Sequence, residues 1–410
     1  MGIRTEVTPH DKGKARFFLT VMTVIGLRGI PDVMGGIETH CAQLLPLVLN
    51  NASPAELKII LLARKGYVDA RGDVEGVEQI PIWAPRHPAA ETIVHTFFAL
   101  LYARFVLRSD LVHLHAIGPG LLAPLARLLG FKLLFTHHGA DYRRQKWGPF
   151  SRFMLRKGED MAVRFAHRVI TVSPSTANRL KDRFPTCADR IVHIPNGFSR
   201  EAPSEVTRDF AEKHGIRPGS YVITIGRLVP EKAQDLLIEA FQASRLPLKD
   251  PPWKLLIAGD ADHANDYARS LRKKAAQDDN IILLGKVPRK TVLALNASSG
   301  LFVLPSYHEG LSIAALEALH SGVQVLLSDI DANLNIGLPQ ENYFQSGSVE
   351  KLTEKLNSDL VDRDRGPDVD LSRFDWDEIA RATLREIEEA VGGAPPPRVV
   401  TSSASHGSKG

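Results

Sequence analysis

One repeating pattern restricts the fold of this chain more than any other feature. A short apolar run is followed by a turn and then by a stretch with helical periodicity, and this pattern recurs along almost the whole chain. Short apolar runs that alternate with amphipathic helices favour βα units and parallel sheets. In the first half, the expected strands are Phe17–Gly26, Leu57–Ala63, Leu111–Ala116, Lys132–His138, Arg168–Ser173 and Ile191–Pro195. In the second half, they are Tyr221–Gly226, Lys254–Gly259, Ile281–Gly285, Gly300–Pro305 and Gln324–Ser328. The pattern therefore predicts an α/β fold.

The alternation lapses around Pro195, where the polar stretch NGFSREAPSEVTRDF predicts a linker. A chain of 410 residues is also too long for one ordinary hydrophobic core. We therefore expect an extension with the start of the first strand, two Rossmann-like domains, a C-terminal helix that packs back on the N-terminal domain, and a disordered Pro/Ser/Gly-rich tail. The corresponding residues are 1–21, 22–198, 199–375, 376–391 and 392–410.

The N-terminal segment also has some features of a signal peptide. Lys12, Lys14 and Arg16 precede the apolar stretch FFLTVMTVIGL, which is the order of charge and apolar region in a signal peptide. The sequence RGIPDVMGG follows without the small residues of a cleavage site. A first buried strand is therefore the preferred interpretation.

The composition excludes several classes of protein. With 44% hydrophobic and 24% charged residues the chain is typical of soluble globular proteins, and a net charge of +4 gives no indication of nucleic-acid binding. No apolar run reaches the roughly 20 residues that a membrane span needs. Cys41 and Cys187 are the only cysteines, so we expect no structural disulfide and a reducing, cytoplasmic location.

One stretch is strongly basic. Between Arg143 and Arg183, eleven Lys or Arg residues stand against three Asp or Glu residues and are interleaved with aromatic side chains. Such a pattern suits an anionic membrane surface, here the inner face of the cell membrane, or a phosphate-bearing acceptor. A basic face exposed to solvent fits the pattern equally well.

Two turns at the ends of predicted strands suit an anionic ligand. Gly35 and Gly36 follow the first strand and open a helix, where free N–H groups favour an anion and glycine lets the backbone approach it. In GRLVPEKAQD, Arg227 and Lys232 follow the first strand of the second half. An arginine fork and a lysine point charge at this edge of the sheet can clamp a diphosphate.

A third turn adds two carboxylates. In HEGLSIAALEALHSG, Glu309 falls in the loop after a strand, and Glu317 lies further along the helix on the side that can face the same ligand. A helix N-terminus that can hold a phosphate is formed by the backbone of Gly310, Leu311 and Ser312. Because carboxylates accept paired hydrogen bonds from hydroxyl groups, the stretch predicts a sugar-nucleotide site.

This ordered set of motifs resembles glycosyltransferase family 4, whose members are retaining enzymes of the GT-B fold. The resemblance extends from about Thr23 to Ala390, and the stretches GLRGIPDVMGGIET and THHGADYRRQKWG resemble the branch that acts in bacterial surface-polysaccharide assembly. It implies two Rossmann-like domains with parallel sheets that face one another across a cleft. It also implies transfer of a sugar from a nucleotide diphosphate to a hydroxyl of a glycan or lipid-linked acceptor.

The resemblance assigns roles on the donor side. Arg227 and Lys232 would bind the donor diphosphate. Glu309 would hold the hydroxyls of the donor sugar, beside the backbone of residues 310–312, and Glu317 would bind the ribose. Gly35 and Gly36 would approach the phosphates or the sugar from the other domain.

The resemblance also points to the stretch FTHHGADYRR. His138 would lie near the donor sugar and the acceptor, while the adjacent His137 would point the opposite way on the strand and serve the structure. Asp141 and Arg143 would line the acceptor pocket. Asn196 and Gly197 match a further turn of the family.

The family does not usually require a metal, and we expect none. Asp260 and Asp262 have the spacing of a metal-binding carboxylate pair, but they follow the second strand of the C-terminal half and are interpreted as a turn near the nucleotide. We expect no other cofactor. Two other functions remain open from the residues alone: a sugar-nucleotide epimerase of the same architecture, and a non-catalytic protein that binds nucleotide sugars.

The expected mechanism needs no enzyme nucleophile. As the glycosidic bond of the donor breaks, the leaving diphosphate gains negative charge, which cations and a helix N-terminus stabilise. Retention suggests that the acceptor attacks on the face that the diphosphate leaves, and that a diphosphate oxygen takes its proton. We count His138, Glu309, Arg227 and Lys232 as the catalytic residues.

Overall fold

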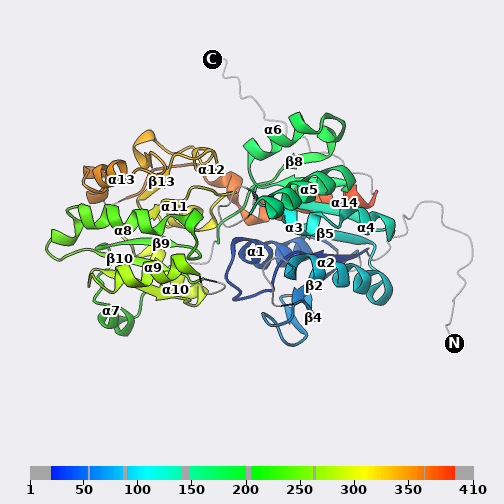
Figure 1. The fold of residues 1–410 in the computed structure, drawn as a ribbon, viewed down its shortest axis with the longest axis horizontal. Coiled ribbons are helices and arrows are strands. Elements are labelled where there is room, and N and C mark those ends of the chain that lie inside the picture. The colour runs from blue at the N-terminus through cyan, green and yellow to red at the C-terminus, as the bar shows by residue number, and fades with distance from the viewer. Residues whose placement is uncertain are drawn as a thin grey trace, which may run out of the picture.

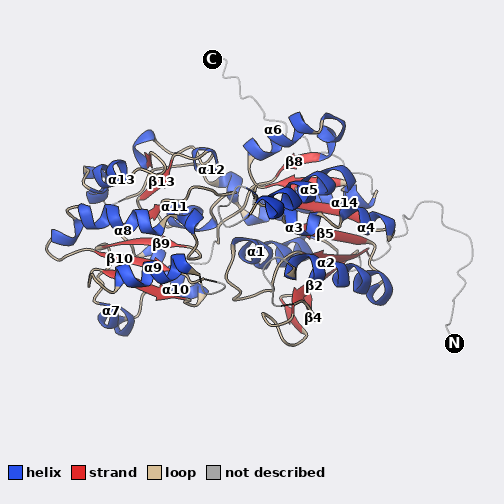
Figure 2. Cartoon of the chain, viewed as in Figure 1, coloured by secondary structure: helices blue, strands red, loops and turns tan. Residues whose placement is uncertain are grey.

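The computed structural model describes residues 20–53, 56–85, 90–140, 142, 148–199, 205–261, 265–363 and 365–392. Figure 1 shows two α/β lobes side by side, one blue to green and the other green to orange, and Figure 2 shows a sheet between helices in each. The expected extension before Thr20 and the tail after Gly392 lie outside the described residues. No helix in the described part is both long and apolar enough to cross a bilayer.

The N-terminal lobe is built on an eight-stranded sheet with the order β3-β4-β2-β1-β5-β6-β7-β8. All neighbours are parallel except β3 and β4, which form an antiparallel hairpin at one edge. The interior strands are apolar on both faces because helices cover both. The strands are β1 (Thr20–Ile25), β2 (Leu57–Arg64), β3 (Gly72–Val74), β4 (Val77–Ile82), β5 (Leu111–His115), β6 (Lys132–His137), β7 (Arg168–Thr171) and β8 (Ile191–His193).

Two helical layers enclose this sheet. Helices α2, α4, α5 and α6 pack on one hydrophobic cluster, which includes Leu100, Ala126, Val163 and Leu180, while α1 packs on the other face. The expected helix Glu91–Leu107 is α-helical only to Tyr102 and continues as a π-helical turn, Ala103–Leu107. The helices are α1 (Gly36–Asn51), α2 (Glu91–Tyr102), α3 (Ile117–Gly120), α4 (Ala123–Leu128), α5 (Pro149–Phe165) and α6 (Pro174–Arg183).

The C-terminal lobe has a six-stranded parallel sheet with the order β11-β10-β9-β12-β13-β14, which is the Rossmann order. Its strands are β9 (Tyr221–Ile225), β10 (Lys254–Ala258), β11 (Ile281–Gly285), β12 (Leu301–Leu304), β13 (Val325–Ser328) and β14 (Tyr343–Phe344). Its helices are α7 (Arg208–His214), α8 (Gln234–Ala243), α9 (Asp266–Ala275), α10 (Arg289–Ala297), α11 (Ile313–His320), α12 (Asp331–Leu334) and α13 (Val349–Leu356). Separate hydrophobic clusters lie on the two faces of this sheet.

The chain passes between the lobes twice, and the two passages lie side by side. Phe198, on the way out, forms a parallel bridge with Asp375, on the way back, and the Phe198 amide donates to the Phe374 carbonyl at 3.2 Å. The last helix, α14 (Trp376–Val391), then packs on α1 and against β6 and β7 of the N-terminal lobe. Arg168 of β7 fastens α14 through ion pairs with Glu386 and Glu389.

Candidate active site

Each Rossmann-like sheet places its ligand-facing turns at the carboxyl ends of its strands. In the C-terminal lobe, the turn after β9 holds Lys232 against the loop after β12. Lys232 Nζ lies 2.5 Å from Glu309 Oε1, and Ser306 Oγ donates to the same oxygen at 2.7 Å. The stem of Lys232 runs over Gly226, whose missing side chain leaves room for it. The structure thus brings together two of the predicted catalytic residues.

Arg227 lies in the same turn as Lys232, directly after Gly226. Its carbonyl oxygen accepts a hydrogen bond from Gln234 Nε2 at 2.9 Å, which ties the turn to the first residue of α8. Gly259, at the end of β10, fits beneath it because a Cβ there would lie 2.0 Å from the Gly226 carbonyl oxygen. The two cations therefore occupy one well-fixed turn at the edge of the sheet.

The residues after Glu309 lead into α11. Ser312 is the N-cap of this helix, and its side chain accepts from the Ala315 amide at 3.3 Å. Leu316 and Leu319 are buried and hold the helix on the C-terminal sheet, while the buried Ile313 packs in a cluster of the N-terminal lobe. The backbone at Gly310 and Leu311 lies just before the helix N-terminus, where a phosphate is favoured.

Glu317 lies in the middle of α11 and is almost fully buried. Its two carboxylate oxygens accept from the guanidinium of Arg289, the first residue of α10, with one distance of 3.1 Å. The predicted contact of Glu317 with a ribose stays a prediction. In the structure, the carboxylate that was expected to face the nucleotide is paired with an arginine from the neighbouring helix.

In the N-terminal lobe, Gly35 and Gly36 begin α1 after β1. A Cβ at Gly35 would lie 2.0 Å from a carboxylate oxygen of Glu38 and 2.5 Å from the Arg28 guanidinium, whereas a Cβ at Gly36 would meet nothing within 4 Å. Arg28 Nε donates to Glu38 Oε1 at 2.9 Å, and both side chains are buried. The missing side chain of Gly35 thus leaves room for a buried ion pair, whereas a side chain at Gly36 would point into open space.

The two adjacent histidines after β6 have different surroundings. His137 is fully buried, with Nε2 2.8 Å from Glu159 Oε1 of α5, and Arg179 and Arg183 of α6 also pair with Glu159. His138 points the other way, toward His115 and His40. The geometry therefore places His137 in a structural network and His138 at the edge of the sheet.

The network around Glu159 should make part of the free energy of unfolding depend on pH in the acidic range. Burial alone would raise the pKa of Glu159, but hydrogen bonds from His137 and Arg179 outweigh it and lower the pKa to about 2. Between this value and the usual value of 4.5, the unfolded chain binds a proton that the folded chain does not, so stability present above pH 4.5 is lost as the pH falls. We expect Glu159→Gln to lower the free energy of unfolding at pH 7 by about 3 kcal/mol.

Urea unfolding of both proteins at a series of pH values measures this effect. The difference between wild type and Glu159→Gln should shrink as the pH falls through 4.5 toward 2. Glu212→Gln is the matched control, because Glu212 forms an exposed ion pair with Arg208. A difference that is independent of pH would contradict the assignment.

His138 belongs to a group of neutral imidazoles. His115 Nδ1 lies 2.9 Å from His138 Nε2, and the His40 and His138 ring centroids are 4.8 Å apart. Burial lowers the pKa of His40 to about 4 and lowers those of His115 and His138 well below their usual value. At neutral pH His138 is therefore an uncharged hydrogen-bonding group, suited to orienting a hydroxyl rather than to neutralising a phosphate.

The two halves of the site meet directly. A Cβ on Gly310 would lie 2.0 Å from the His138 carbonyl oxygen, so the loop after β12 packs on the backbone of the other lobe. Asn196, in the first passage between the lobes, joins them as well. Its Oδ1 lies 2.9 Å from His40 Nδ1, and its Nδ2 donates to the Leu311 carbonyl oxygen at 2.8 Å.

Several predicted residues cannot be placed. Asp141 and Arg143, the expected acceptor residues, lie outside the described residues, as does Asp262. Asp260 pairs with Arg272 of α9, with Asp260 Oδ1 2.5 Å from Arg272 Nη2. That the protein works without a metal stays a prediction.

Sequence reasoning missed Arg28, Glu38, His40, His115 and Arg289. A signal for His115 was present, since the HLH stretch ending β5 puts two histidines on one face of a strand. Glu38 and His40 follow the Gly-Gly turn within the first turns of α1. Arg289 gave no signal, because its partner lies on another helix.

Two protein-family models match neighbouring parts of the sequence and together cover most of the chain. Residues 34–201 match the family described as Glycosyltransferase Family 4. Residues 206–373 match Glycosyl transferases group 1. The boundary between the two matches falls at the first passage between the lobes.

Two curated relatives cover much of the chain. A GDP-mannose:cellobiosyl-diphosphopolyprenol alpha-mannosyltransferase from Xanthomonas campestris is 25% identical over 298 residues, or 69% of this chain and 75% of that protein. A GDP-mannose-dependent alpha-(1-6)-phosphatidylinositol monomannoside mannosyltransferase from Mycobacterium tuberculosis is 27% identical over 373 residues, or 84% of this chain and 91% of that protein.

Among solved structures, a sucrose-phosphate synthase from Thermosynechococcus elongatus is similar in fold. It superposes with a TM-score of 0.67 at 18% identity, and the match covers 91% of this chain and 96% of that one. The likeness shows a GT-B architecture for the two lobes.

Proposed function

Because the chain belongs to glycosyltransferase family 4, a family of retaining enzymes, we propose that it transfers a sugar from a nucleotide diphosphate to a hydroxyl of a lipid-linked glycan in bacterial polysaccharide biosynthesis. The observation that best supports the proposal is the Lys232–Glu309 pair. It sets a cation for the diphosphate and a carboxylate for the sugar hydroxyls side by side, just before the N-terminus of α11.

The residues divide the work of the reaction between the lobes. Arg227, Lys232 and the N-terminus of α11 stabilise the charge that grows on the leaving diphosphate. Glu309 accepts hydrogen bonds from the sugar. His138, as a neutral imidazole in the facing lobe, orients the sugar or the incoming hydroxyl. The acceptor hydroxyl attacks from the side of the departing diphosphate, and an oxygen of the diphosphate takes the proton of that hydroxyl.

The choice of a lipid-linked acceptor is supported by the relatives. Both have acceptors attached to a lipid, one a diphosphopolyprenol and the other a phosphatidylinositol mannoside. The donor named for both relatives is GDP-mannose, which makes it the first donor to test here.

The test is a screen of nucleotide sugars, including GDP-mannose and UDP-galactose, with and without polyprenyl-diphosphate-linked saccharides. We expect slow hydrolysis of one donor alone and faster transfer with an acceptor. Proton NMR of the product should show the anomeric configuration of the donor. Binding of donors without hydrolysis or transfer in any combination would contradict the proposal, and so would an inverted product.

A bilayer surface is a further part of the proposal, supported by the exposed apolar side chains. Nine of the eleven large apolar residues exposed in the described part lie in the N-terminal lobe. These are Trp83, Phe97, Phe98, Phe105, Val106, Leu128, Phe150, Phe153 and Phe165. Exposed aromatic residues in such number suit an interface with lipid.

Most of these side chains belong to one helical layer. Because α2, α4 and α5 bury their inner sides in the same cluster under the sheet, their outer sides face the same way. An open apolar hollow of about 460 Å³ lies beside α2 and the turn that follows it, lined by Ile82, Trp83, Phe98, Leu101, Tyr102, Phe105 and Val106. Such a hollow has the size and polarity to hold part of a hydrocarbon chain.

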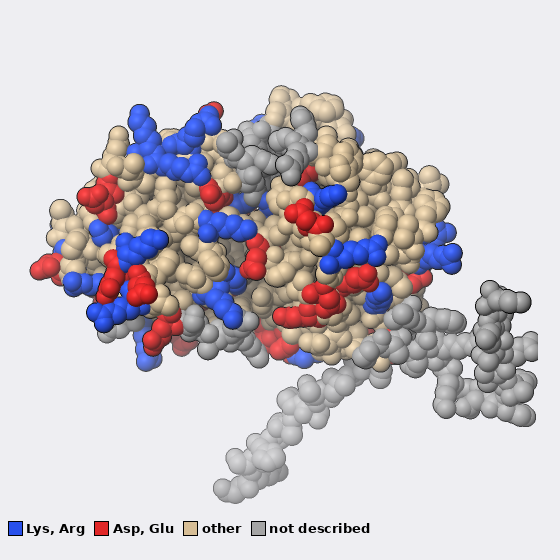
Figure 3. All heavy atoms as spheres, turned by 90° about the horizontal axis from the view of Figure 1, so that it is seen from below, with Lys and Arg blue, Asp and Glu red and all other residues tan. Residues whose placement is uncertain are grey.

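Basic residues accompany the aromatic ones on α5, where Lys157 Nζ lies 5.5 Å from the Phe153 ring centroid. On the face drawn in Figure 3, by contrast, Lys and Arg are interspersed with Asp and Glu over both lobes. The combination of cations and exposed aromatic rings on α5 is what favours an anionic bilayer.

Co-sedimentation with vesicles tests this surface. We expect the protein to bind vesicles containing phosphatidylglycerol more than neutral ones, and Phe105→Ser with Phe150→Ser to reduce the bound fraction. Leu248→Ser is the matched control, since Leu248 is even more exposed than the two phenylalanines but lies in the C-terminal lobe. Binding that depends neither on anionic lipid nor on the two phenylalanines would remove the membrane surface from the proposal.

A further inference from the structure

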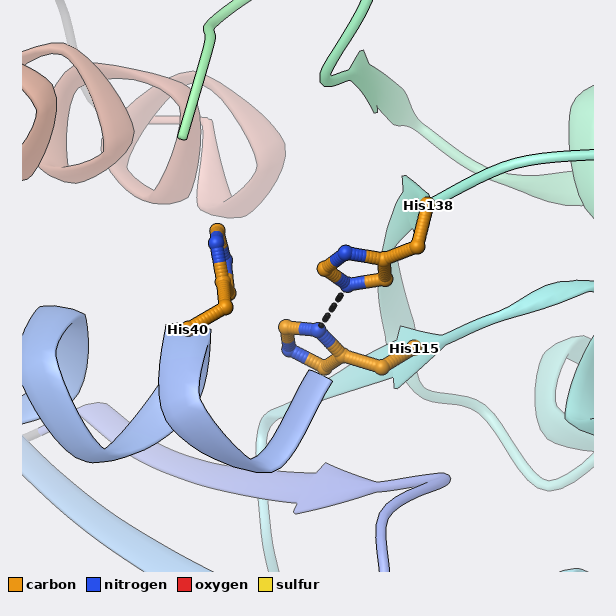
Figure 4. A group of neighbouring side chains, drawn as sticks. All are labelled: His40, His115 and His138. Carbon is orange, nitrogen blue, oxygen red and sulfur yellow. Dashed lines mark hydrogen bonds between the residues drawn. The ribbon is translucent and has the colours of Figure 1, made fainter. Parts of the chain in front are cut away.

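Three histidines from three different elements converge at the edge of the N-terminal sheet (Figure 4). His40 comes from α1, His115 from the end of β5, and His138 from the residue after β6. One ring nitrogen of each lies within 4.8 Å of the others, and in the described part of the chain this is the one group of three such ligands close enough to hold a metal ion.

The hydrogen bonds around His40 fix which of its nitrogens is available. Asn196 Nδ2 donates to the Leu311 carbonyl oxygen, which orients the amide so that its oxygen faces His40. His40 Nδ1 therefore carries the proton and donates to Asn196 Oδ1 at 2.9 Å. The other nitrogen, Nε2, then has a lone pair. In a histidine that binds a metal through one ring nitrogen, the other ring nitrogen usually donates its N–H to an oxygen acceptor, as Nδ1 does here.

The spacing of the other two nitrogens is also close to that of a metal site. His115 Nδ1 and His138 Nε2 are 2.9 Å apart. Two nitrogens bound to a tetrahedral zinc ion at about 2.0 Å lie roughly 3.3 Å apart. To bind the ion, the His115 and His138 nitrogens must move slightly further apart, and the His40 ring must rotate toward them. The proton shared by the pair moves to the opposite nitrogen of its ring, so all three ligands bind as neutral imidazoles.

We propose that His40, His115 and His138 form a binding site for a transition-metal ion of the Zn²⁺ class, and that the bound ion inhibits sugar transfer by occupying His138. Three imidazoles select such ions over Mg²⁺ and Ca²⁺, which prefer oxygen ligands. Cys41 Sγ, 3.7 Å from His115 Nδ1, adds a soft atom beside the site. The metal site itself does not depend on the proposed function, whereas the inhibition rests on it.

Metal binding is tested with Zn²⁺ alone, on protein prepared without a polyhistidine tag. Competition against a chromophoric chelator should give one ion per chain for the wild type. His40→Gln and His115→Gln should each weaken binding at least about tenfold. His214→Gln, in α7 of the other lobe, is the matched control and should bind as the wild type does. Unchanged affinity in both cluster variants would overturn the proposal.

Two measurements on the wild type avoid any doubt about whether the variants fold. Zn²⁺ should raise the melting temperature, because the ion binds the folded chain in preference to the unfolded one. Co²⁺ in its place should give the intense visible absorption of a four-coordinate ion with nitrogen ligands. An unchanged melting temperature together with the weak spectrum of a six-coordinate Co²⁺ ion would contradict the site.

The transfer assay separates this proposal from the proposed function. Zn²⁺ should inhibit transfer, and EDTA should restore it. Transfer that is insensitive to Zn²⁺ at concentrations that saturate the site would overturn the inhibitory role while leaving the transferase intact. Zn²⁺ binding by a protein that transfers no sugar would refute the proposed function and leave the metal site standing.

Discussion

Lys232→Met should lower the kcat of sugar transfer by about 10²–10³-fold. The ammonium group lies in a fixed turn, 2.5 Å from Glu309 Oε1, and we propose that it binds the donor diphosphate there. Its attraction to the diphosphate increases as the glycosidic bond breaks, so its removal affects the transition state more than the bound donor. The change also leaves the Glu309 carboxylate without the cation that lies beside it.

Steady-state kinetics together with calorimetric binding of the nucleoside diphosphate distinguish these effects. We expect a large fall in kcat and a smaller rise in the dissociation constant. Lys249→Met is the matched control, because Lys249 forms an ion pair with Asp362 away from the site. Equal kcat values for Lys232→Met and the wild type would show that the turn after β9 does not act on the leaving group.

Gly310→Ala should lower kcat by about 10²-fold while nucleotide binding persists. The new methyl group would lie 2.0 Å from the His138 carbonyl oxygen and 3.1 Å from Val172 Cγ2, so the loop after β12 and the loop after β6 must move apart. Such a shift separates Glu309 from His138. The nucleotide should still bind, because the residues proposed to hold its diphosphate, Arg227 and Lys232, lie in the C-terminal lobe and are not displaced.

Gly72→Ala is a suitable control for this experiment. A Cβ at Gly72 would meet nothing within 4 Å, and the residue lies in the edge hairpin far from the contact between the lobes in the fold. The melting temperature of Gly72→Ala should stay close to that of the wild type, whereas that of Gly310→Ala should fall, because its new methyl group meets backbone atoms. A Gly310→Ala enzyme with normal kcat would mean that the lobes do not need this close contact during transfer.

The sequence predicted the regular part of the fold because each interior strand is a continuous apolar run with clear ends. The strand expected at Lys254–Gly259 is β10, Lys254–Ala258, and the one expected at Lys132–His138 is β6, Lys132–His137. The hairpin of β3 and β4 was missed, since β3 has only three residues and β4, with the sequence VEQIPI, is not a continuous apolar run. The helix expected at Glu91–Leu107 changes to a π-helical turn after Tyr102, a change that no residue pattern indicates.

The site was predictable in its parts but not in its contacts. Lys232 and Glu309 were each placed on the correct turn, yet their pairing depends on the register of β9 against β12. Glu317 was expected beside a ribose, and its ion pair with Arg289 required knowledge of how α10 packs on α11. The convergence of His40, His115 and His138 combines a helix with two strands, which no local pattern reveals.

The return of the chain from Phe374 into α14 has a consequence for recombination between related enzymes. A chimera that exchanges the C-terminal lobe by a single junction near Phe198 would also import a foreign α14, whose inner side must fit Cys41, Leu44 and Leu45 of the resident α1. Two junctions avoid this mismatch, one at each passage between the lobes. Since Phe198 and Asp375 bridge one another, both junctions fall at one place in the molecule, and the C-terminal lobe becomes exchangeable as a single inserted module.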